Sequence, residues 1–304
     1  MKPYRILKDY ALLWSMVLGT LLAPWAYRLA FILPYSLFIM LALTYTRIAP
    51  SDLRITRTHM YLFVAQWILG PAVYVLLSPF DEILAQGLAL IILTPTATSA
   101  SVITAMMGGS MAFVTSYLIP GNVVMALTAP LLLTYLYPNS AAGGYLDTVL
   151  NILGQVSLLL IVPMGLIWGL RFGLPKVHAK LQKRVKWTFY IWCANLVIVT
   201  SNTIQFFLRH DELDLMQGII LGGGTLVVCL LLFFVGRKIG SKAEGHAVNG
   251  GQTLGQKNTV LAIWIALTFM NPVVSVVPSF YVIWQNIINS LELARYKKIH
   301  GEAL

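Results

Sequence analysis

The sequence predicts an all-α membrane protein with ten transmembrane helices. Of the 304 residues, 58% are hydrophobic and 11% are charged, and the mean hydropathy is +0.77. An ordinary soluble domain carries about 25% charged residues. This composition excludes a soluble enzyme with a polar shell, and it excludes a disordered chain. Ten spans of about 20 residues each leave only helix ends and short loops, so we expect one membrane domain over residues 1–304.

Ten apolar segments with short connections supply the predicted helices. They are 10–24, 26–46, 58–79, 82–107, 111–137, 146–171, 187–208, 213–236, 245–270 and 272–293. Short connections make neighbouring helices antiparallel. The first segment follows three basic residues, as in a signal peptide, but no small-x-small cleavage site follows it. We therefore expect it to be retained as a helix.

The distribution of charge predicts the orientation. If the N-terminus is cytoplasmic, 18 of the 21 basic residues fall in cytoplasmic segments, whereas only Arg28 and Arg209 fall outside. The acidic residues divide almost evenly, 5 inside and 6 outside. This bias follows the positive-inside rule and predicts a multi-pass protein of the plasma membrane, here a bacterial inner membrane, with both termini cytoplasmic. The net charge of +10 therefore indicates a lipid bilayer as partner and not nucleic acid.

The basic stretch 171–186 divides the chain into two halves of five predicted helices. Five crossings in each half make the two halves inverted relative to one another. We therefore predict a 5+5 inverted repeat, with residues 1–140 as the first unit and 145–298 as the second. The halves show no convincing sequence identity, so the repeat follows from counting alone. Inverted repeats are common in transporters.

The fourth segment is interrupted by residues 94–101, which read Thr-Pro-Thr-Ala-Thr-Ser-Ala-Ser. Pro95 lacks a backbone donor and breaks the helical hydrogen-bond ladder. One interpretation is a kinked helix whose hydroxyls bond to the preceding turn. The other is an unwound midpoint lined by hydroxyl groups.

The ninth segment is also irregular. Its apolar run, 260–270, has 11 residues and spans about 16 Å, half of an ~30 Å hydrocarbon core. The span must include residues 247–259, which hold three glycines and several amides. Such backbone cannot face lipid and must be buried in protein or line a cavity. Both irregular segments are fourth in their halves, which predicts crossing broken helices at a transport site.

Lys257 is the only basic residue that this topology leaves within a span. Either its ammonium reaches the cytoplasmic surface, or it is buried where the broken helices cross. Cys193 and Cys229 lie in apolar segments, and no H-E-x-x-H motif or aspartate pair occurs. We expect no metal, no cofactor and no enzymatic activity.

Three stretches resemble the bile acid:sodium symporter family. They are Ala65-Gln66-Trp67-Ile68-Leu69-Gly70-Pro71, Thr98-Ser99-Ala100-Ser101-Val102, and residues 278–291, PSFYVIWQNIINSL. The resemblance implies a panel domain and a core domain, with two unwound helices crossing in the core. It implies transport of organic anions by alternating access, typically with two sodium ions.

The resemblance also implies site residues. The substrate-binding positions are Thr98, Ser99, Asn258, Gln285 and Asn286. The ion-site or coupling positions are Lys257, Gln66, Ser101, Thr253, Gln256, Thr115 and Ser116. Thr115 and Ser116 are included as the nearest hydroxyls of the following helix.

The chain departs from the family at its sodium site. A glutamate of the family is Thr253 here, and a glutamine is Lys257. At ~4 Å and an effective dielectric near 20, each unit charge changes cation binding by about 4 kcal/mol. We therefore expect a sodium-independent transporter of a small organic anion, with Lys257 in place of the sodium ion. Transport is proton-coupled if Lys257 titrates, and otherwise uncoupled or driven by pairing with the anion.

Other interpretations remain open from the sequence. A sodium-coupled symporter keeps the family mechanism, and the similar auxin efflux carrier family works without sodium. A channel would use the same broken helices without alternating access. An intramembrane hydrolase would need a dyad such as Ser101–Lys257. The oligomeric state is open, with a monomer among the options.

Overall fold

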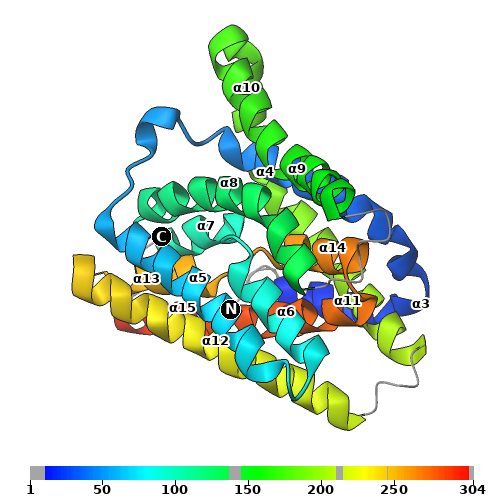
Figure 1. The fold of residues 1–304 in the computed structure, drawn as a ribbon. Helices are drawn as coiled ribbons and strands as arrows, with labels where there is room; N and C mark the ends of the chain where they lie inside the picture. The colour runs from blue at the N-terminus through cyan, green and yellow to red at the C-terminus, as the bar shows by residue number, and fades with distance from the viewer. Residues whose placement is uncertain (1–10, 137–144, 210–214, 245, 301–304) are drawn as a thin grey trace.

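The computed structural model describes residues 11–136, 145–209, 215–244 and 246–300. The regular elements in these ranges are helices, and one isolated bridge pairs Thr96 with Lys257. The protein is thus all-α, as predicted (Figure 1). The predicted boundary of the first repeat at residue 140 lies outside the described residues.

Each predicted apolar segment contains one or more helices, and the segments 82–107 and 245–270 are each interrupted by a non-helical stretch, at 94–97 and 256–258. The first half contains α2 (Ala11–Leu21), α3 (Ala23–Ala26), α4 (Leu33–Tyr45), α5 (Arg57–Leu77), α6 (Glu82–Leu93), α7 (Thr98–Met106) and α8 (Met111–Leu136), with the 3-10 helices η1 (Tyr27–Ile32) and η2 (Pro50–Asp52). The second half contains α9 (Tyr145–Gly173), α10 (Pro175–Gln182), α11 (Trp187–Arg209), α12 (Leu215–Glu244), α13 (Ala247–Gly255), α14 (Thr259–Phe269), η4 (Pro272–Ser275) and α15 (Val276–His300).

Four of the described helical segments are long and apolar enough to cross a membrane. They are Ala23–Tyr45, Arg57–Leu77, Met111–Ala129 and Met216–Ala243. These segments are consistent with an all-α membrane protein. Shorter apolar helices include Glu82–Leu93 and Thr259–Phe269, the apolar arms of the two irregular segments.

Some helices extend beyond the apolar pattern. α12 runs to Glu244 and α15 to His300, past the predicted ends at 236 and 293. Part of the basic stretch 171–186 forms α10, which projects from the rest of the molecule (Figure 1). Lysine and arginine are good helix formers, so the helix continues where the hydrophobic pattern stops.

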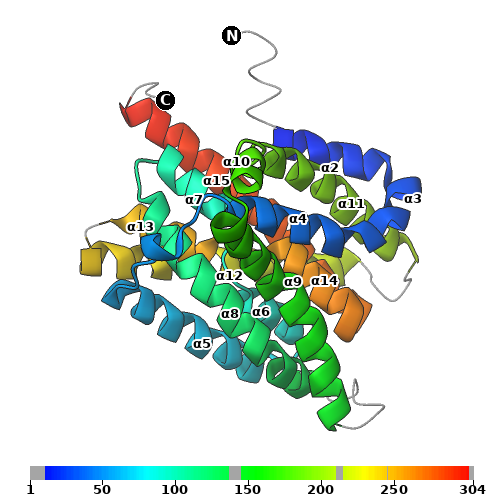
Figure 2. The ribbon, with the colours of Figure 1, turned by 90° about the horizontal axis from the view of Figure 1, so that it is seen from above.

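The basic helix ends gather on one side of the molecule. In Figure 2 the C-terminal ends of α12 and α15 lie on the left, whereas α3 lies on the right. Arg237 and Lys242 belong to the first of these ends, Arg295 and Lys298 to the second, and Arg28 follows α3. This arrangement is the one expected if all four cations face the same side of a bilayer.

α12 and α13 pack closely because glycines face each other. A Cβ atom added to Gly250 would meet the backbone carbonyl of Gly236, and one added to Gly255 would meet the ring of Phe233. Small residues let helix backbones approach closely in membrane proteins. α13, the polar arm of the ninth segment, is thereby held against the long helix α12.

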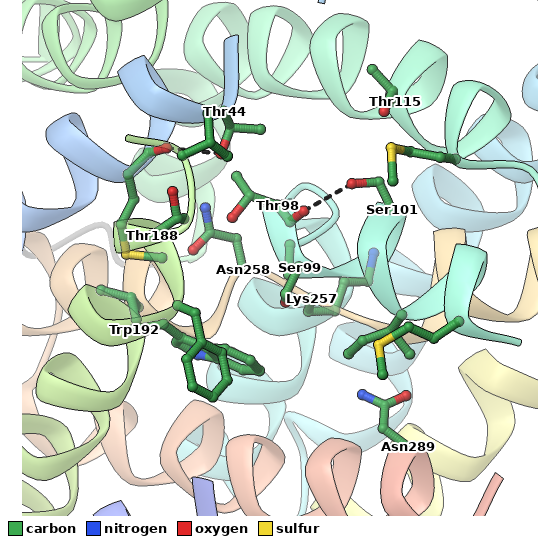
Figure 3. A pocket seen from close by; sticks show the side chains of 18 of the residues that line it. Thr44, Thr98, Ser99, Ser101, Thr115, Thr188, Trp192, Lys257, Asn258 and Asn289 are labelled. Carbon is green, nitrogen blue, oxygen red and sulfur yellow. Dashed lines mark hydrogen bonds between the residues drawn. The ribbon is translucent and has the colours of Figure 1, made fainter. Parts of the chain in front are cut away.

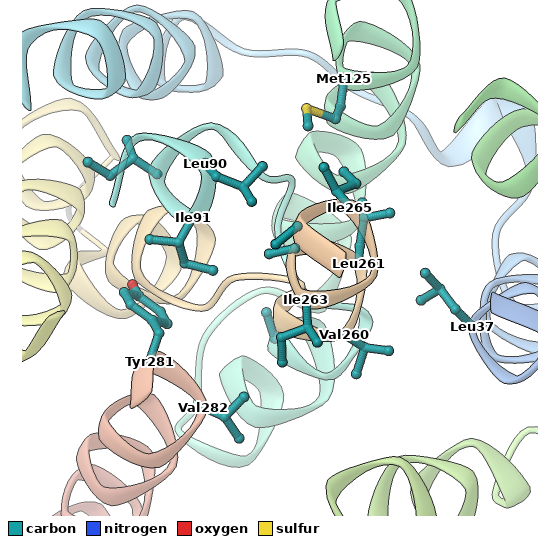
Figure 4. Close-up of a cluster of buried hydrophobic side chains, with 14 of the residues drawn as sticks. Leu37, Leu90, Ile91, Met125, Val260, Leu261, Ile263, Ile265, Tyr281 and Val282 are labelled. Atoms are coloured by element: carbon teal, nitrogen blue, oxygen red, sulfur yellow. The ribbon is translucent and has the colours of Figure 1, made fainter. Parts of the chain in front are cut away.

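The apolar core surrounds α14. Val260, Leu261, Ile263 and Ile265 are buried on different sides of this helix. They pack in a cluster with residues of α6 and α15, including Leu90 and Tyr281 (Figure 4). A helix that is apolar on all sides is buried within the protein. The core therefore fixes α14 at the centre of the bundle.

Candidate functional site

Both irregular segments are broken helices. α6 ends at Leu93, where Thr94 adopts an extended ψ of 139°, and α7 begins at Thr98 beyond Pro95. α13 ends at Gly255 and α14 begins at Thr259, with an extended residue at Gln256. The unwound midpoint, rather than a continuous kinked helix, is the conformation of the fourth segment.

The two breaks cross and pair with each other. The amide of Ala97 donates to the carbonyl of Gln256 at 2.9 Å, and the amide of Asn258 donates to the carbonyl of Pro95 at 2.9 Å. Thr96 adds a side-chain bond, donating Oγ1 to the carbonyl of Thr253 at 2.6 Å. An unwound segment leaves backbone groups that need partners when buried. Each break supplies partners for the other, which explains how both persist inside the bundle.

Lys257 is fully buried at this crossing, so its ammonium does not reach the surface. Its Nζ donates to the carbonyl of Thr94 at 3.2 Å. Thr94 is the C-cap of α6, where unpaired carbonyls carry the negative end of the helix dipole. Among the described residues, no carboxylate forms a salt bridge with Lys257. The cation is therefore held by backbone carbonyl at a helix end.

Gln66 joins the same carbonyls. Its Nε2 donates to the carbonyl of Leu93 at 2.8 Å and of Thr94 at 3.3 Å. The hydroxyl of Tyr117 donates to Gln66 Oε1 at 2.7 Å and fixes the amide. Gln66 and Lys257 thus share the carbonyl of Thr94 as acceptor.

A cavity of about 790 Å³ opens beside the crossing (Figure 3). It lies among α4, α7, α8, α11, α14 and α15. Eight of the predicted site residues line it: Thr98, Ser99, Ser101, Thr115, Lys257, Asn258, Gln285 and Asn286. Its volume lies within the range of about 300–1,000 Å³ typical of small-molecule sites.

Gln285 and Asn258 position the second break. Gln285 Oε1 accepts from the amide of Lys257 at 3.0 Å, so α15 holds the backbone of the residue that carries the ammonium. Asn258 Oδ1 caps α14 by accepting from the amide of Leu261 at 3.2 Å. Both side chains are buried and also line the cavity.

Four predicted residues do not line the cavity: Gln66, Thr253, Gln256 and Ser116. Thr253 Oγ1 donates to the carbonyl of Asn249 at 2.7 Å, and Gln256 Nε2 donates to Ser99 Oγ at 2.7 Å. Ser116 accepts from the amide of Arg54 at 3.1 Å, in the connection before α5. Gln66, Thr253 and Gln256 therefore support the crossing, whereas Ser116 is engaged elsewhere.

The lining of the cavity favours negative charge. It contains three basic residues, Arg47, Lys186 and the fully buried Lys257, and no aspartate or glutamate lines it among the described residues. The first residues of α7 and α14 also line it, so the positive ends of two helix dipoles lie at the cavity, although the amides of Thr259 and Leu261 in the first turn of α14 already have partners. Converging helix N-termini and an ammonium form a site suited to an anion.

The Ser101–Lys257 dyad, which the alternative of an intramembrane hydrolase would need, is not joined by a hydrogen bond in the described structure. Ser101 Oγ donates to the carbonyl of Thr98 at 3.1 Å, while Lys257 Nζ bonds to Thr94. No hydrogen bond joins Ser101 to Lys257 in the described part of the chain. A search of the described residues found no group of three or more His, Cys, Asp or Glu side chains able to hold a metal ion.

Sequence reasoning missed Asn289, Trp192 and Tyr117. Asn289 and Trp192 line the cavity, and both are drawn in Figure 3. Asn289 lies one helical turn beyond Gln285 and Asn286, so its spacing was a usable signal. Tyr117 carries no sequence signal that links it to Gln66, and only the fold brings the two together. No protein-family model and no curated protein matches this chain.

Proposed function

We propose that this protein is a secondary transporter of a small organic anion that works by alternating access without sodium. In this proposal the Lys257 ammonium occupies the place of a coupling cation. The observation that carries it is one cavity, lined by two half-helix N-termini and Lys257, at the crossing of two broken helices. Paired broken helices are the usual form of a substrate site in transporters.

The charges of the cavity support an anionic substrate. Arg47, Lys186 and Lys257 line it without a described carboxylate. Asn286 lines the cavity, and its buried Oδ1 has no hydrogen-bond partner among the described residues. A substrate that donates a hydrogen bond there would satisfy this atom, because buried polar groups are normally paired. We therefore favour an organic anion that also carries a hydroxyl, amine or amide donor.

The carbonyls at the end of α6 support the ammonium-for-cation idea. Backbone carbonyls are ligands for hard cations such as sodium. Here the carbonyl of Thr94 accepts from Lys257 Nζ and from Gln66 Nε2. A sodium ion at the same carbonyls would lie beside a unit positive charge. Sodium independence follows from that repulsion.

The remaining features of the proposal concern topology and family. The proposed arrangement has ten spans in a 5+5 inverted repeat over 1–140 and 145–298. It includes a panel domain and a core domain, and both termini are cytoplasmic in a bacterial inner membrane. The motifs at 65–71, 98–102 and 278–291 support relation to the bile acid:sodium symporter family. This chain would differ from other members of that family at two positions, where Thr253 replaces a glutamate and Lys257 replaces a glutamine.

The proposal is tested in two steps. A thermal-shift screen of purified protein against mono- and dicarboxylates, with sodium or with choline, identifies an anion that stabilises the protein. That anion is then tested for saturable uptake and counterflow in proteoliposomes. Counterflow without sodium supports the transporter. Non-saturating flux would instead indicate a channel, and absence of stabilisation by any anion would count against the substrate class.

A further inference from the structure

A second pocket, separate from the central cavity, lies between the N-terminal end of α5 and the C-terminal end of α12. Its volume is about 510 Å³. It is lined by Arg57, Thr58, Tyr61, Ile239, Lys242 and Ala243. None of these residues belongs to the central cavity or to the helix crossing, so the proposed transport site leaves this pocket unexplained.

The pocket is positively charged. Arg57 comes from one helix and Lys242 from the other, and both side chains are exposed. Among the residues whose side chains the structure describes, neither forms a salt bridge with a carboxylate, and no aspartate or glutamate lines the pocket. Arg57 is also the first residue of α5, where the helix dipole favours negative charge. Two cations from different helices beside hydroxyl groups are suited to a phosphate.

The position of the pocket corresponds to the depth of lipid headgroups. Arg57 begins the apolar segment Arg57–Leu77, and Lys242 lies at the end of Met216–Ala243. Both segments are long enough to cross a bilayer, so their ends lie near the membrane surface. Basic pockets between spans at this depth are suited to anionic headgroups.

An exposed apolar stripe continues from the pocket along α5. Tyr61 is 56% exposed, Val64 is 55% exposed and Ile68 is 62% exposed. With Arg57 they are spaced four, three and four residues apart, which places all four on one face of the helix. A free phosphate ion would make no contact with these apolar side chains, whereas the acyl chains of a lipid would cover them. The combination therefore favours a lipid over a soluble anion.

We propose that the pocket between α5 and α12 binds the phosphate headgroup of an anionic glycerophospholipid of the phosphatidylglycerol type. Arg57 and Lys242 contact the phosphate, the hydroxyl of Tyr61 donates to it, and an acyl chain lies along Val64 and Ile68. The proposal concerns lipid binding and stands apart from the transported substrate.

The test is native mass spectrometry of the full chain in neutral detergent, titrated with phosphatidylglycerol or phosphatidylcholine. Wild type should prefer phosphatidylglycerol at least tenfold. Arg57→Gln with Lys242→Gln should weaken that binding about 30-fold, or about 2 kcal/mol, because each cation contributes about 1 kcal/mol near an anionic lipid. The matched control is Lys176→Gln with Lys180→Gln, which removes two cations from α10. It should change the affinity for phosphatidylglycerol less than about threefold.

A further variant keeps both charges. Ala243→Trp fills the pocket and should also weaken phosphatidylglycerol binding at least tenfold. If the double variant of Arg57 and Lys242 and the double variant of Lys176 and Lys180 lose phosphatidylglycerol binding equally, the proposal is overturned, because binding would then depend on net charge alone. Unchanged binding in Ala243→Trp would also overturn it. Displacement of the lipid by glycerol 3-phosphate at equal concentration would assign the pocket to a soluble phosphate instead.

Discussion

Exchanging the charges around Lys257 should convert a sodium-independent site into a sodium-dependent one. The variant is Lys257→Gln combined with Thr253→Glu, which removes the buried ammonium and adds a carboxylate on the same broken segment. Lys257 and Thr253 are both fully buried, and both contact the other break, through Thr94 and Thr96. The exchange therefore acts at the crossing and not on the surface.

The magnitude follows from the geometry. Lys257 Nζ lies 3.2 Å from the Thr94 carbonyl. A sodium ion bound at that carbonyl would lie within ~4 Å of the ammonium, where like charges repel by about 4 kcal/mol at an effective dielectric near 20. This corresponds to roughly a thousandfold weaker sodium binding in the wild type. Lys257→Gln removes the penalty, and Thr253→Glu adds a negative charge on the same broken segment.

The assay compares uptake of the anion found by thermal shift into proteoliposomes with sodium or choline outside. Wild type should transport equally in both. The double variant should transport only with sodium, and sodium alone should raise its melting temperature. Lys257→Gln with Thr253→Gln is the matched control, because it has nearly the same volume at residue 253 but no carboxylate.

Two results would refute this reasoning. A steep sodium requirement in the wild type would mean that the ammonium does not exclude the ion. An equal response to sodium in the Glu and Gln double variants would mean that the carboxylate does not contribute to a cation site. Lys186→Gln, which removes a cavity cation away from the crossing, should lower anion affinity without creating sodium dependence.

Further outcomes test the topology, the cavity, the packing and the coupling. Cysteines introduced at Ser140 and Asp211, both outside the described residues, should be labelled from outside the cell, and labelling only from the cytoplasm would contradict the inverted repeat. Asn258→Ala and Asn286→Ala should each lose anion binding while the protein stays folded, and unchanged transport in both would remove these residues from the site. Gly250→Val should lower the free energy of unfolding by about 1–3 kcal/mol in thermal denaturation, because it forces a side chain into the backbone of α12. Wild-type uptake that rises with an inward proton gradient would assign coupling to protons, whereas a flat pH profile would leave the fixed-charge mechanism.

The sequence by itself determined the class of fold and the two segments that contain the breaks. Low charge content and recurrent apolar runs predict buried or lipid-facing helices, since only helices satisfy their backbone locally in hydrocarbon. Pro95 and the glycine- and amide-rich stretch 247–259 mark the two irregular segments, although the structure shows residues 247–255 as helix α13 and unwinds only 256–258. Lys257 within a span left two positions open from the sequence, at the surface or buried at the crossing, and the structure buries it.

Only the tertiary structure decided which polar groups meet. The pairing of Ala97 with Gln256, and of Tyr117 with Gln66, joins residues far apart in the chain. Periodicity gives the face on which a residue lies but not the partner it finds across the bundle. Ser116 and Thr115 are adjacent in sequence, yet Thr115 lines the cavity while Ser116 bonds to the amide of Arg54. Successive residues of a helix point about 100° apart, so the packing of α8 against its neighbours, and not the residue type, determines which hydroxyl reaches the site.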